Sequence, residues 1–259
     1  MKKQIELTEY LKAAQGAAEK AARQIRRAGA PKKVSLKEDA ELLTDADIAS
    51  QDSLLDGLSR FGLPIQSEEK NSAITDEPRW VIDPLDGTEH FARGSPLYSV
   101  VVSLVQNKQP VLGVVCAPAL GRVYSARMGG GAWLNGKKIS TSKMAHLDRS
   151  ILFVHPYRRF AAEGYPDAFL ALHRCTRHAR YYGSSALELS FVADGTADGI
   201  AKCALRLWDV AAGVIIAKEA GANASAFDGS QWNDKKTSLV VSNRKLHPEI
   251  LEIIRKNKS

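Results

Sequence analysis

The stretch VIDPLDGTEHF, residues 81–91, ends an apolar run with two aspartates placed three positions apart. Asp83 and Asp86 are followed directly by Gly87 and Thr88, so both carboxylates fall in a tight turn at the end of a buried strand. Two carboxylates this close repel each other unless a cation lies between them. The stretch therefore predicts a divalent cation, held by the two carboxylates together with the Leu85 carbonyl.

The pattern around this turn predicts one mixed α/β chain. Apolar residues at helical spacing predict helices over residues 4–28, from Thr44 to about 61, over 184–195 and over 208–222. Runs of β-branched residues predict strands at 80–83, 98–105, 111–118, 150–156 and 238–243. Asn135-Gly136 predicts a tight hairpin, and a mixed polar region extends from about 156 to 180. This order favours layered sheets and helices.

The composition is that of an ordinary globular protein, with 44% hydrophobic and 25% charged residues among 259. No run approaches the roughly 18 apolar residues of a membrane span, and the basic start lacks a signal-peptide core. The three cysteines, an odd number without close pairing, predict neither a disulfide framework nor a zinc site. We therefore expect a reduced, cytoplasmic protein with no membrane partner.

The net charge of +7 comes largely from lysines and arginines near the two ends of the chain. Nucleic acid, a membrane surface or anionic small substrates would all suit this charge. Aromatic residues that would stack on single-stranded bases are not interleaved with these basic residues. We favour solvated helix faces, and nucleic-acid binding through the basic termini stays the open alternative.

The other acidic positions have a structural and a chemical interpretation. Thr44-x-x-Asp47 is typical of a capping box, and Asp209 is placed to be the N-cap of a helix. Glu68-Glu69 is typical of a solvated acidic pair. Taken together with the turn at 83–88, these carboxylates instead predict hard oxygen ligands for metal-assisted phosphoryl hydrolysis.

Two other phosphate-binding or phosphatase motifs are disfavoured. The glycines of GGGAWLNGKKIS (129–140) are not followed by the Lys-Ser or Lys-Thr of a P-loop, so we interpret them as turn and bulge positions. Haloacid-dehalogenase phosphatases carry Asp-x-Asp-Gly-Thr after a strand, but this chain has Asp-x-x-Asp-Gly-Thr. The extra residue would misplace the second carboxylate for a general acid.

Several motifs in the same order resemble the inositol monophosphatase family of Mg²⁺-dependent, lithium-sensitive phosphomonoesterases. They are LLTDAD (42–47), EEK (68–70), WVIDPLDGTEHF (80–91), GGGAWLNGKKI (129–139), YGSSALELSFVADGTAD (182–198) and LWDVAAGVIIAKEAGA (207–222). The resemblance spans nearly the whole chain, although Ser67 stands where the family usually has Gly. It implies a five-layer αβαβα sandwich and a homodimer.

The resemblance also implies a metal site for two or three Mg²⁺ ions. Glu68, Asp83 and the Leu85 carbonyl would hold the ion that activates water. Asp83, Asp86 and Asp209 would hold a second ion near the leaving oxygen. Water would attack directly, without a phospho-enzyme.

Catalytic roles follow from the same resemblance. Asp47 and Thr88 would orient the nucleophilic water, with Glu68 acting through its metal. The N–H groups of Gly87 and Thr88 would hold the phosphate, as helix starts do. Glu69 would lie behind the metal ligands. His90 follows the signature closely, but we favour a structural or surface role for it.

Substrate contacts are expected from one loop and one strand besides the phosphate site. The expected substrate-binding residues are Asp86, Gly87, Thr88, Gly183, Ser184, Ser185, Lys202 and Asp209. Inositol-hydrolysing members have a Glu seven residues before the equivalent of Asp209, and this chain has Lys202 there. Lys202 would suit a second anionic group or would face solvent, and Ser185 would contact substrate or cap the following helix.

The residues and the resemblance together predict a hydrolase. Residues 1–259 are expected to form a single catalytic unit, with most metal ligands in roughly 1–140, and with Asp209 and the substrate loop in roughly 141–259. The leading hypothesis is an inositol-1-monophosphatase type enzyme acting on a small sugar or polyol phosphate. The alternatives are a bisphosphate phosphatase acting on fructose 1,6-bisphosphate, a 3′,5′-nucleotide or NADP, and a basic protein that binds RNA or the transcription machinery.

Overall fold

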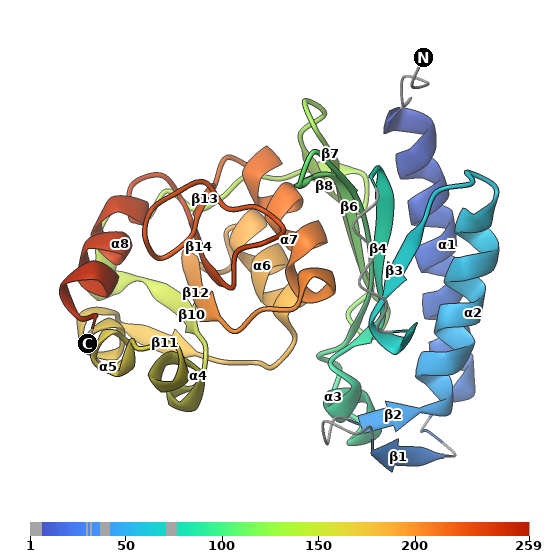
Figure 1. Cartoon of the computed structure of the whole chain (residues 1–259), viewed down its shortest axis with the longest axis horizontal. Coiled ribbons are helices and arrows are strands. Elements are labelled where there is room, and N and C mark those ends of the chain that lie inside the picture. The colour runs from blue at the N-terminus through green and yellow to red at the C-terminus, as the bar shows by residue number, and fades with distance from the viewer. Residues whose placement is uncertain (1–6, 30, 32, 37–41, 71–76, 259) are drawn as a thin grey trace.

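A computed structural model describes residues 7–29, 31, 33–36, 42–70 and 77–258 of the chain, the side chain of Lys70 excepted. Helices and sheets alternate across the molecule in five layers (Figure 1). The helices are α1 (Leu7–Ala28), α2 (Asp45–Ser59), α3 (Thr88–Ala92), α4 (Tyr157–Ala162), α5 (Pro166–Cys175), α6 (Ser185–Ala193), α7 (Leu207–Glu219) and α8 (His247–Lys256), with 3-10 turns at Glu68–Lys70 and Leu147–Arg149.

The strands form two large sheets and a small hairpin. They are β1 (Val34–Leu36), β2 (Leu42–Thr44), β3 (Ile65–Ser67), β4 (Arg79–Asp86), β5 (Ser99–Gln106), β6 (Gln109–Ala117), β7 (Arg122–Arg127), β8 (Ala132–Leu134), β9 (Lys137–Lys138), β10 (Ile151–Val154), β11 (His178–Arg180), β12 (Gly199–Cys203), β13 (Asn223–Ser225) and β14 (Ser238–Ser242). The seven-stranded sheet has the order β3-β4-β5-β6-β7-β8-β9, and only its β3–β4 pair is parallel. The five-stranded sheet has the order β11-β10-β12-β14-β13.

The layer order confirms the expected αβαβα sandwich. In Figure 1, α1 and α2 cover one face of the seven-stranded sheet, and α6 and α7 lie between the two sheets. The helices α4, α5 and α8 cover the outer face of the five-stranded sheet. Each sheet therefore has both faces covered, which explains why most of β4, β5 and β6 is buried.

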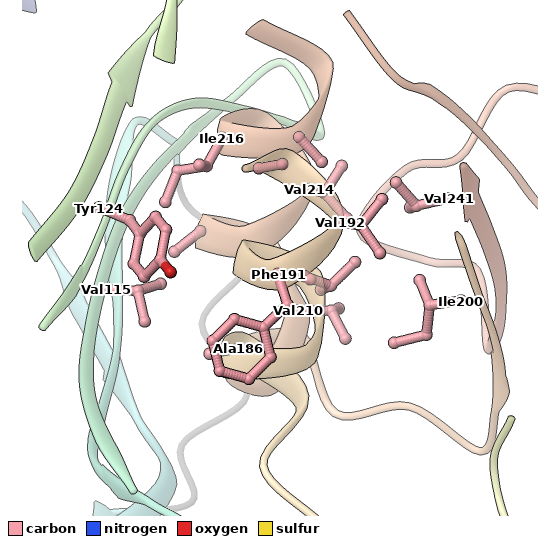
Figure 2. Packing of buried hydrophobic residues seen from close by; sticks show 14 of the residues in the cluster. Val115, Tyr124, Ala186, Phe191, Val192, Ile200, Val210, Val214, Ile216 and Val241 are labelled. Atoms are coloured by element: carbon pink, nitrogen blue, oxygen red, sulfur yellow. The ribbon is translucent and has the colours of Figure 1, made fainter. Parts of the chain in front are cut away.

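The central helices are buried on every side. Figure 2 shows Val115 and Tyr124 of the seven-stranded sheet on one side of α6 and α7, and Ile200 and Val241 of the other sheet opposite. Full burial of an aliphatic side chain contributes roughly 1.5–3 kcal/mol. Small residues permit this packing, because a Cβ at Gly213 would lie 2.5 Å from Leu189 Cβ.

The stretch at 83–86 contains an irregularity in β4 that positions the two aspartates. Asp83 pairs with Val101 and Asp86 with Ser99, so β4 carries one more residue than β5 between these pairs. In a regular strand, residues three positions apart point to opposite faces. The extra residue changes the alternation of side chains between the two faces of the sheet. Pro84 suits the bulge, because proline has no N–H group that would be left without a partner there. The bulge thus lets both carboxylates reach the same end of the sheet.

Other expectations from the sequence are partly confirmed. Asn135 and Gly136 form the two-residue turn between β8 and β9, with φ of 49° and 76°. The first helix is confirmed from Leu7, and the predicted positions 4–6 lie outside the described residues. The mixed polar region at 156–180 holds α4, α5 and β11, for which the sequence pattern gave no prediction; β12 and α8 were also not predicted.

The structure also describes the three cysteines and tests the helices for membrane-spanning length. Cys116, Cys175 and Cys203 are all free thiols. Within the described part of the chain, every helix is too short or too polar to span a bilayer.

Candidate active site

A cluster of carboxylates lies where three elements meet. Glu68 follows β3, Asp83 belongs to β4, and Asp209 belongs to the first turn of α7. One carboxylate oxygen from each lies within 4.8 Å of the others. Burial raises the pKa of Asp83 well above its usual value, and the charges of Glu68, Asp86 and Asp209 raise it further. Such mutually repelling oxygen donors fit a divalent cation between them.

Asp86 is held rigidly beside this cluster. Its Oδ2 accepts hydrogen bonds from the Ser184 hydroxyl at 2.6 Å, the Ala186 N–H at 3.0 Å and the Ser99 hydroxyl at 3.3 Å. Burial raises the pKa of Asp86 to about 6, although the Ser184 hydrogen bond and the Lys202 charge oppose the rise. The carboxylate therefore links the end of β4 to the start of α6.

Asp47 both caps a helix and contacts Thr88. Its Oδ2 accepts hydrogen bonds from the N–H of Thr44 at 2.8 Å and from the Thr44 hydroxyl at 2.5 Å, in a capping box at the start of α2. Its Oδ1 lies 3.0 Å from the Thr88 hydroxyl, which is also 2.9 Å from the Leu85 carbonyl oxygen. A hydroxyl has one hydrogen, so when Thr88 donates to Asp47 its oxygen is able to accept from a water.

Position 87 requires a glycine, both because of its backbone conformation and because of the atoms that surround it. It precedes α3 with φ of +88°, a conformation that L side chains rarely adopt. A Cβ there would lie 2.7 Å from the Leu97 carbonyl oxygen. Only glycine therefore allows the chain to turn at this point and begin α3 at Thr88.

The variant Gly87→Ala is expected to lose most phosphatase activity and to unfold at a lower temperature. The left-handed backbone alone costs roughly 1–2 kcal/mol, and the clash with Leu97 would displace Thr88 as well. Gly94→Ala is the matched control, since Gly94 has φ of +76° but its Cβ would meet nothing within 4 Å. Thermal unfolding and phosphate release measure both variants. Equal losses in the two would show that the close contact at Gly87 is unimportant.

A buried ion pair lies directly behind the loop at 181–185. Lys202 is 1% exposed, and its Nζ lies 2.7 Å from Glu188 Oε2 and 2.6 Å from Ser185 Oγ. Glu188 Oε1 also accepts hydrogen bonds from the N–H groups of Tyr182 at 2.6 Å and Gly183 at 3.2 Å. The alternative that Lys202 faces solvent is therefore wrong. A contact between Lys202 and substrate stays a prediction, and Lys202 is not among the described residues that line the pocket.

Three smaller expectations are also resolved. Ser185 is the first residue of α6 and makes no capping bond; it accepts a hydrogen bond from Lys202 and lines the pocket. Asp209 is not an N-cap, because Arg206 occupies that position of α7. His90 has a structural role, since its Nε2 contacts the Tyr182 carbonyl oxygen.

The cluster opens into a pocket of about 910 Å³. The expected site residues that line it are Glu68, Asp83, Leu85, Asp86, Gly87, Thr88, Gly183, Ser185 and Asp209. Ser184 and Asp47 are buried behind the wall and act through hydrogen bonds to Asp86 and Thr88. Glu69 is not among the described residues that line the pocket.

Sequence reasoning missed the basic part of the lining. It comprises Arg93, His155, Arg158, Arg159 and Arg206, with Tyr181 beside them. The signal was present in HPYRR (155–159), which overlaps the end of the strand predicted at 150–156 and directly follows the observed β10. Residues directly after a sheet strand commonly carry function, and the mixed region from 156 onward was not interpreted in this way.

The sequence model of the inositol monophosphatase family matches residues 6–259. The chain belongs to this family. A Thermotoga maritima protein named fructose-1,6-bisphosphatase/inositol-1-monophosphatase is 32% identical over 217 residues, which cover 83% of this chain and 82% of the relative. A Streptomyces coelicolor histidinol-phosphatase is 34% identical over 230 residues, 85% of this chain and 86% of that protein.

The solved structure of a Thermotoga maritima inositol monophosphatase matches with a TM-score of 0.87 and 29% identity, covering 96% of this chain and 97% of that one. As a member of this family, the protein is a phosphatase that acts on small phosphorylated substrates. The relatives are named for different substrates. Family membership therefore establishes the class of reaction, phosphate ester hydrolysis, and leaves the substrate to be determined.

Proposed function

We propose that the protein is a Mg²⁺-dependent phosphomonoesterase that hydrolyses a small sugar or polyol phosphate by direct attack of water. The observation that carries this proposal is the convergence of Glu68, Asp83 and Asp209 within 4.8 Å of one another. An all-oxygen ligand set suits Mg²⁺, and the resemblance implies two or three ions. Bound Mg²⁺ would supply Lewis-acid stabilisation of charge on the phosphate and on the leaving oxygen.

The residues of the chain would position the reactants. The Thr88 hydroxyl, held by Asp47 at 3.0 Å, would accept a hydrogen bond from the attacking water and orient it. The backbone N–H groups of Gly87 and Thr88 would donate to phosphate oxygens. The water oxygen forms a bond to phosphorus, the ester P–O bond breaks, and the leaving oxygen takes a proton. The products are an alcohol and inorganic phosphate.

Inositol 1-phosphate is the leading substrate type from the sequence. The bisphosphate alternative was based on Lys202 and on the positive net charge, and the ion pair of Lys202 with Glu188 weakens only the first of these two arguments. The complete set of carboxylates supports an enzyme over a protein whose main role is binding RNA or the transcription machinery. A homodimer stays a prediction from the resemblance.

Phosphate release from inositol 1-phosphate should require Mg²⁺ and should stop when the metal is chelated. Asp209→Asn should lower turnover by about 10³-fold, because removing a ligand loses several kcal/mol of charge stabilisation. Thermal unfolding checks that the variant is folded. Phosphate release that persists after chelation, or near-normal turnover in Asp209→Asn, would contradict the proposal.

A further inference from the structure

A histidine side chain joins the loop at 181–185 to the helix that begins at Thr88. The loop connects β11 of the five-stranded sheet to α6, whereas α3 follows β4 of the seven-stranded sheet. The Nε2 atom of His90, in α3, contacts the carbonyl oxygen of Tyr182 in the loop. A carbonyl oxygen only accepts, so Nε2 carries the hydrogen and donates it. This hydrogen bond links two segments that are 92 positions apart in the chain.

The peptide unit that His90 contacts is held at both ends. Its carbonyl oxygen belongs to Tyr182 and its N–H to Gly183. The Gly183 N–H donates to Glu188 Oε1 at 3.2 Å, and the Tyr182 N–H donates to the same oxygen at 2.6 Å. The C=O and N–H of one planar trans peptide point in opposite directions. His90 and Glu188 therefore hold the peptide plane between them.

The ring of His90 is presented by a rigid backbone. The His90 carbonyl oxygen accepts hydrogen bonds from the N–H of Ser95 at 2.9 Å and the N–H of Arg93 at 3.2 Å. The next residue, Phe91, is 6% exposed and packs edge-on against Tyr98, with ring centroids 5.1 Å apart. Because α3 is anchored in the core beside His90, a shift of the loop would break the hydrogen bond rather than carry the ring with it.

Gly183 allows the histidine ring to approach the loop closely. Its φ is +75°, and a Cβ there would lie 3.2 Å from His90 Nε2. Gly183 and Ser185 line the pocket, whereas His90 is not among the described residues that line it. Any effect of His90 on a bound substrate therefore passes through the loop.

The other end of the loop is held independently of His90. The Ser184 hydroxyl and the Ala186 N–H donate to Asp86 Oδ2 at 2.6 Å and 3.0 Å. Loss of the His90 hydrogen bond would free the peptide that precedes Gly183 and would leave these two bonds to Asp86 in place. The part of the pocket wall that moves would then be Gly183 and not the carboxylates.

We infer that His90 is a positioning residue, which holds the loop at 181–185 against α3 and thereby shapes the site for the leaving group of the ester. This inference rests on the proposed function, in which the phosphate lies at the carboxylates and at Thr88. The leaving group would then contact Gly183 and Ser185, and the position of these residues relative to Thr88 depends on the His90 hydrogen bond. His90 touches no reacting atom, so it acts on binding of the leaving group.

The test separates the leaving-group site from the phosphate site. Kinetic constants are measured for wild type, for His90→Leu and His90→Ala, which lack a donor, and for His90→Gln, whose side-chain amide keeps one. His146→Leu is the control, because His146 is an exposed histidine that is not among the described lining residues. The substrates are inositol 1-phosphate and fructose 1-phosphate, and the inhibitor is inorganic phosphate, which has no leaving group.

Both donor-free variants are expected to raise KM by about tenfold for at least one ester, with kcat within about threefold of wild type, because the Tyr182 carbonyl loses its partner. The inhibition constant of inorganic phosphate should stay within about twofold, since uniform binding is lost only for the leaving group. His90→Gln should recover most of the KM increase, and His146→Leu should match wild type. A role in stability alone would lower the folded fraction, and hence kcat, at an unchanged KM.

Thermal unfolding is measured for every variant, and one folded donor-free variant is enough for the comparison. An unchanged KM for both esters, an equal rise in the inhibition constant of phosphate, or a glutamine variant as impaired as the leucine variant would overturn the inference. Unfolding of both donor-free variants at the assay temperature would show that His90 serves stability, and would overturn it as well.

The same measurements distinguish this inference from the proposed function. Mg²⁺-dependent hydrolysis with equal constants in wild type and His90→Leu would leave the phosphatase assignment intact and remove only the positioning role of His90. No Mg²⁺-dependent phosphate release from either ester by wild type would overturn the proposed function and the inference with it.

Discussion

Replacing Asp83 by Asn should lower phosphate release by about 10³-fold or more, since a ligand to the proposed metals is lost. The protein should nevertheless stay folded, and in the absence of metal it should be more stable than wild type. Asp83 is 2% exposed and is surrounded by the charges of Glu68, Asp86 and Asp209, so its ionised form is costly without a cation. Asn removes this charge, and its side-chain oxygen is still able to accept the Leu85 N–H bond that Asp83 Oδ1 accepts at 2.9 Å.

Thermal unfolding with and without Mg²⁺ measures both parts of this prediction. Mg²⁺ should raise the unfolding temperature of wild type, because it binds the folded state, and should raise that of Asp83→Asn much less. Asp56→Asn is the control, since Asp56 is an exposed carboxylate paired with Lys20 on the surface. A variant that kept wild-type turnover, or that was strongly destabilised in the absence of metal, would show that the carboxylates do not form a metal site.

Glu188→Gln should cause the largest loss of stability among single substitutions near the site. Burial lowers the pKa of Lys202, but the charge of Glu188, the hydrogen bond to it and the charges of Tyr181 and Asp86 together outweigh burial and leave the pKa above its usual value, so the lysine is charged inside the protein. Removing one partner of a buried pair typically costs about 3–5 kcal/mol. For a chain of this length, that corresponds to a fall in unfolding temperature of roughly 6–20 °C.

The double variant Glu188→Gln/Lys202→Met separates charge from packing. It should recover much of the stability, because no unpaired charge stays buried. Glu249→Gln, at an exposed position of α8, is the control and should change stability little. A loss below about 1 kcal/mol in Glu188→Gln would mean that the ion pair contributes no more than a surface pair does.

The same ion pair should affect catalysis through the loop that it supports. Glu188 accepts the N–H groups of Tyr182 and Gly183, and the next residue, Ser184, holds Asp86 at 2.6 Å. Lys202→Glu would place the new carboxylate beside that of Glu188 in a buried space, and the two would repel each other. A loss of activity in that variant would therefore reflect disruption of the loop at 181–185. Stability must therefore be measured beside any activity of a Lys202 variant.

Much of the site could be predicted because its chemistry is local in the chain. Asp83, Asp86, Gly87 and Thr88 lie within six residues, so they are close in space whatever surrounds them. The bulge in β4 that aims both carboxylates the same way was not predicted. The capping box at Thr44 and Asp47 is equally local, because it needs only the first turn of α2. The contact between Asp47 and Thr88, in contrast, was expected from the family resemblance and not from spacing.

The sequence by itself determined the strand that carries Asp83, the strands that flank it, the hairpin at Asn135–Gly136 and, through the family motifs, the layered fold. The predicted turn at 83–86 is a bulge within β4. Only the tertiary structure decided the environment of Lys202 and the basic residues that line the pocket. Whether a lysine is a ligand or a buried partner depends on which helix packs behind its strand, and α6 places Glu188 there. Likewise, Arg158 and Arg159 line the same pocket as the carboxylates only because β10 and β4, in different sheets, end at that pocket. Such long-range placement leaves no local pattern in the chain.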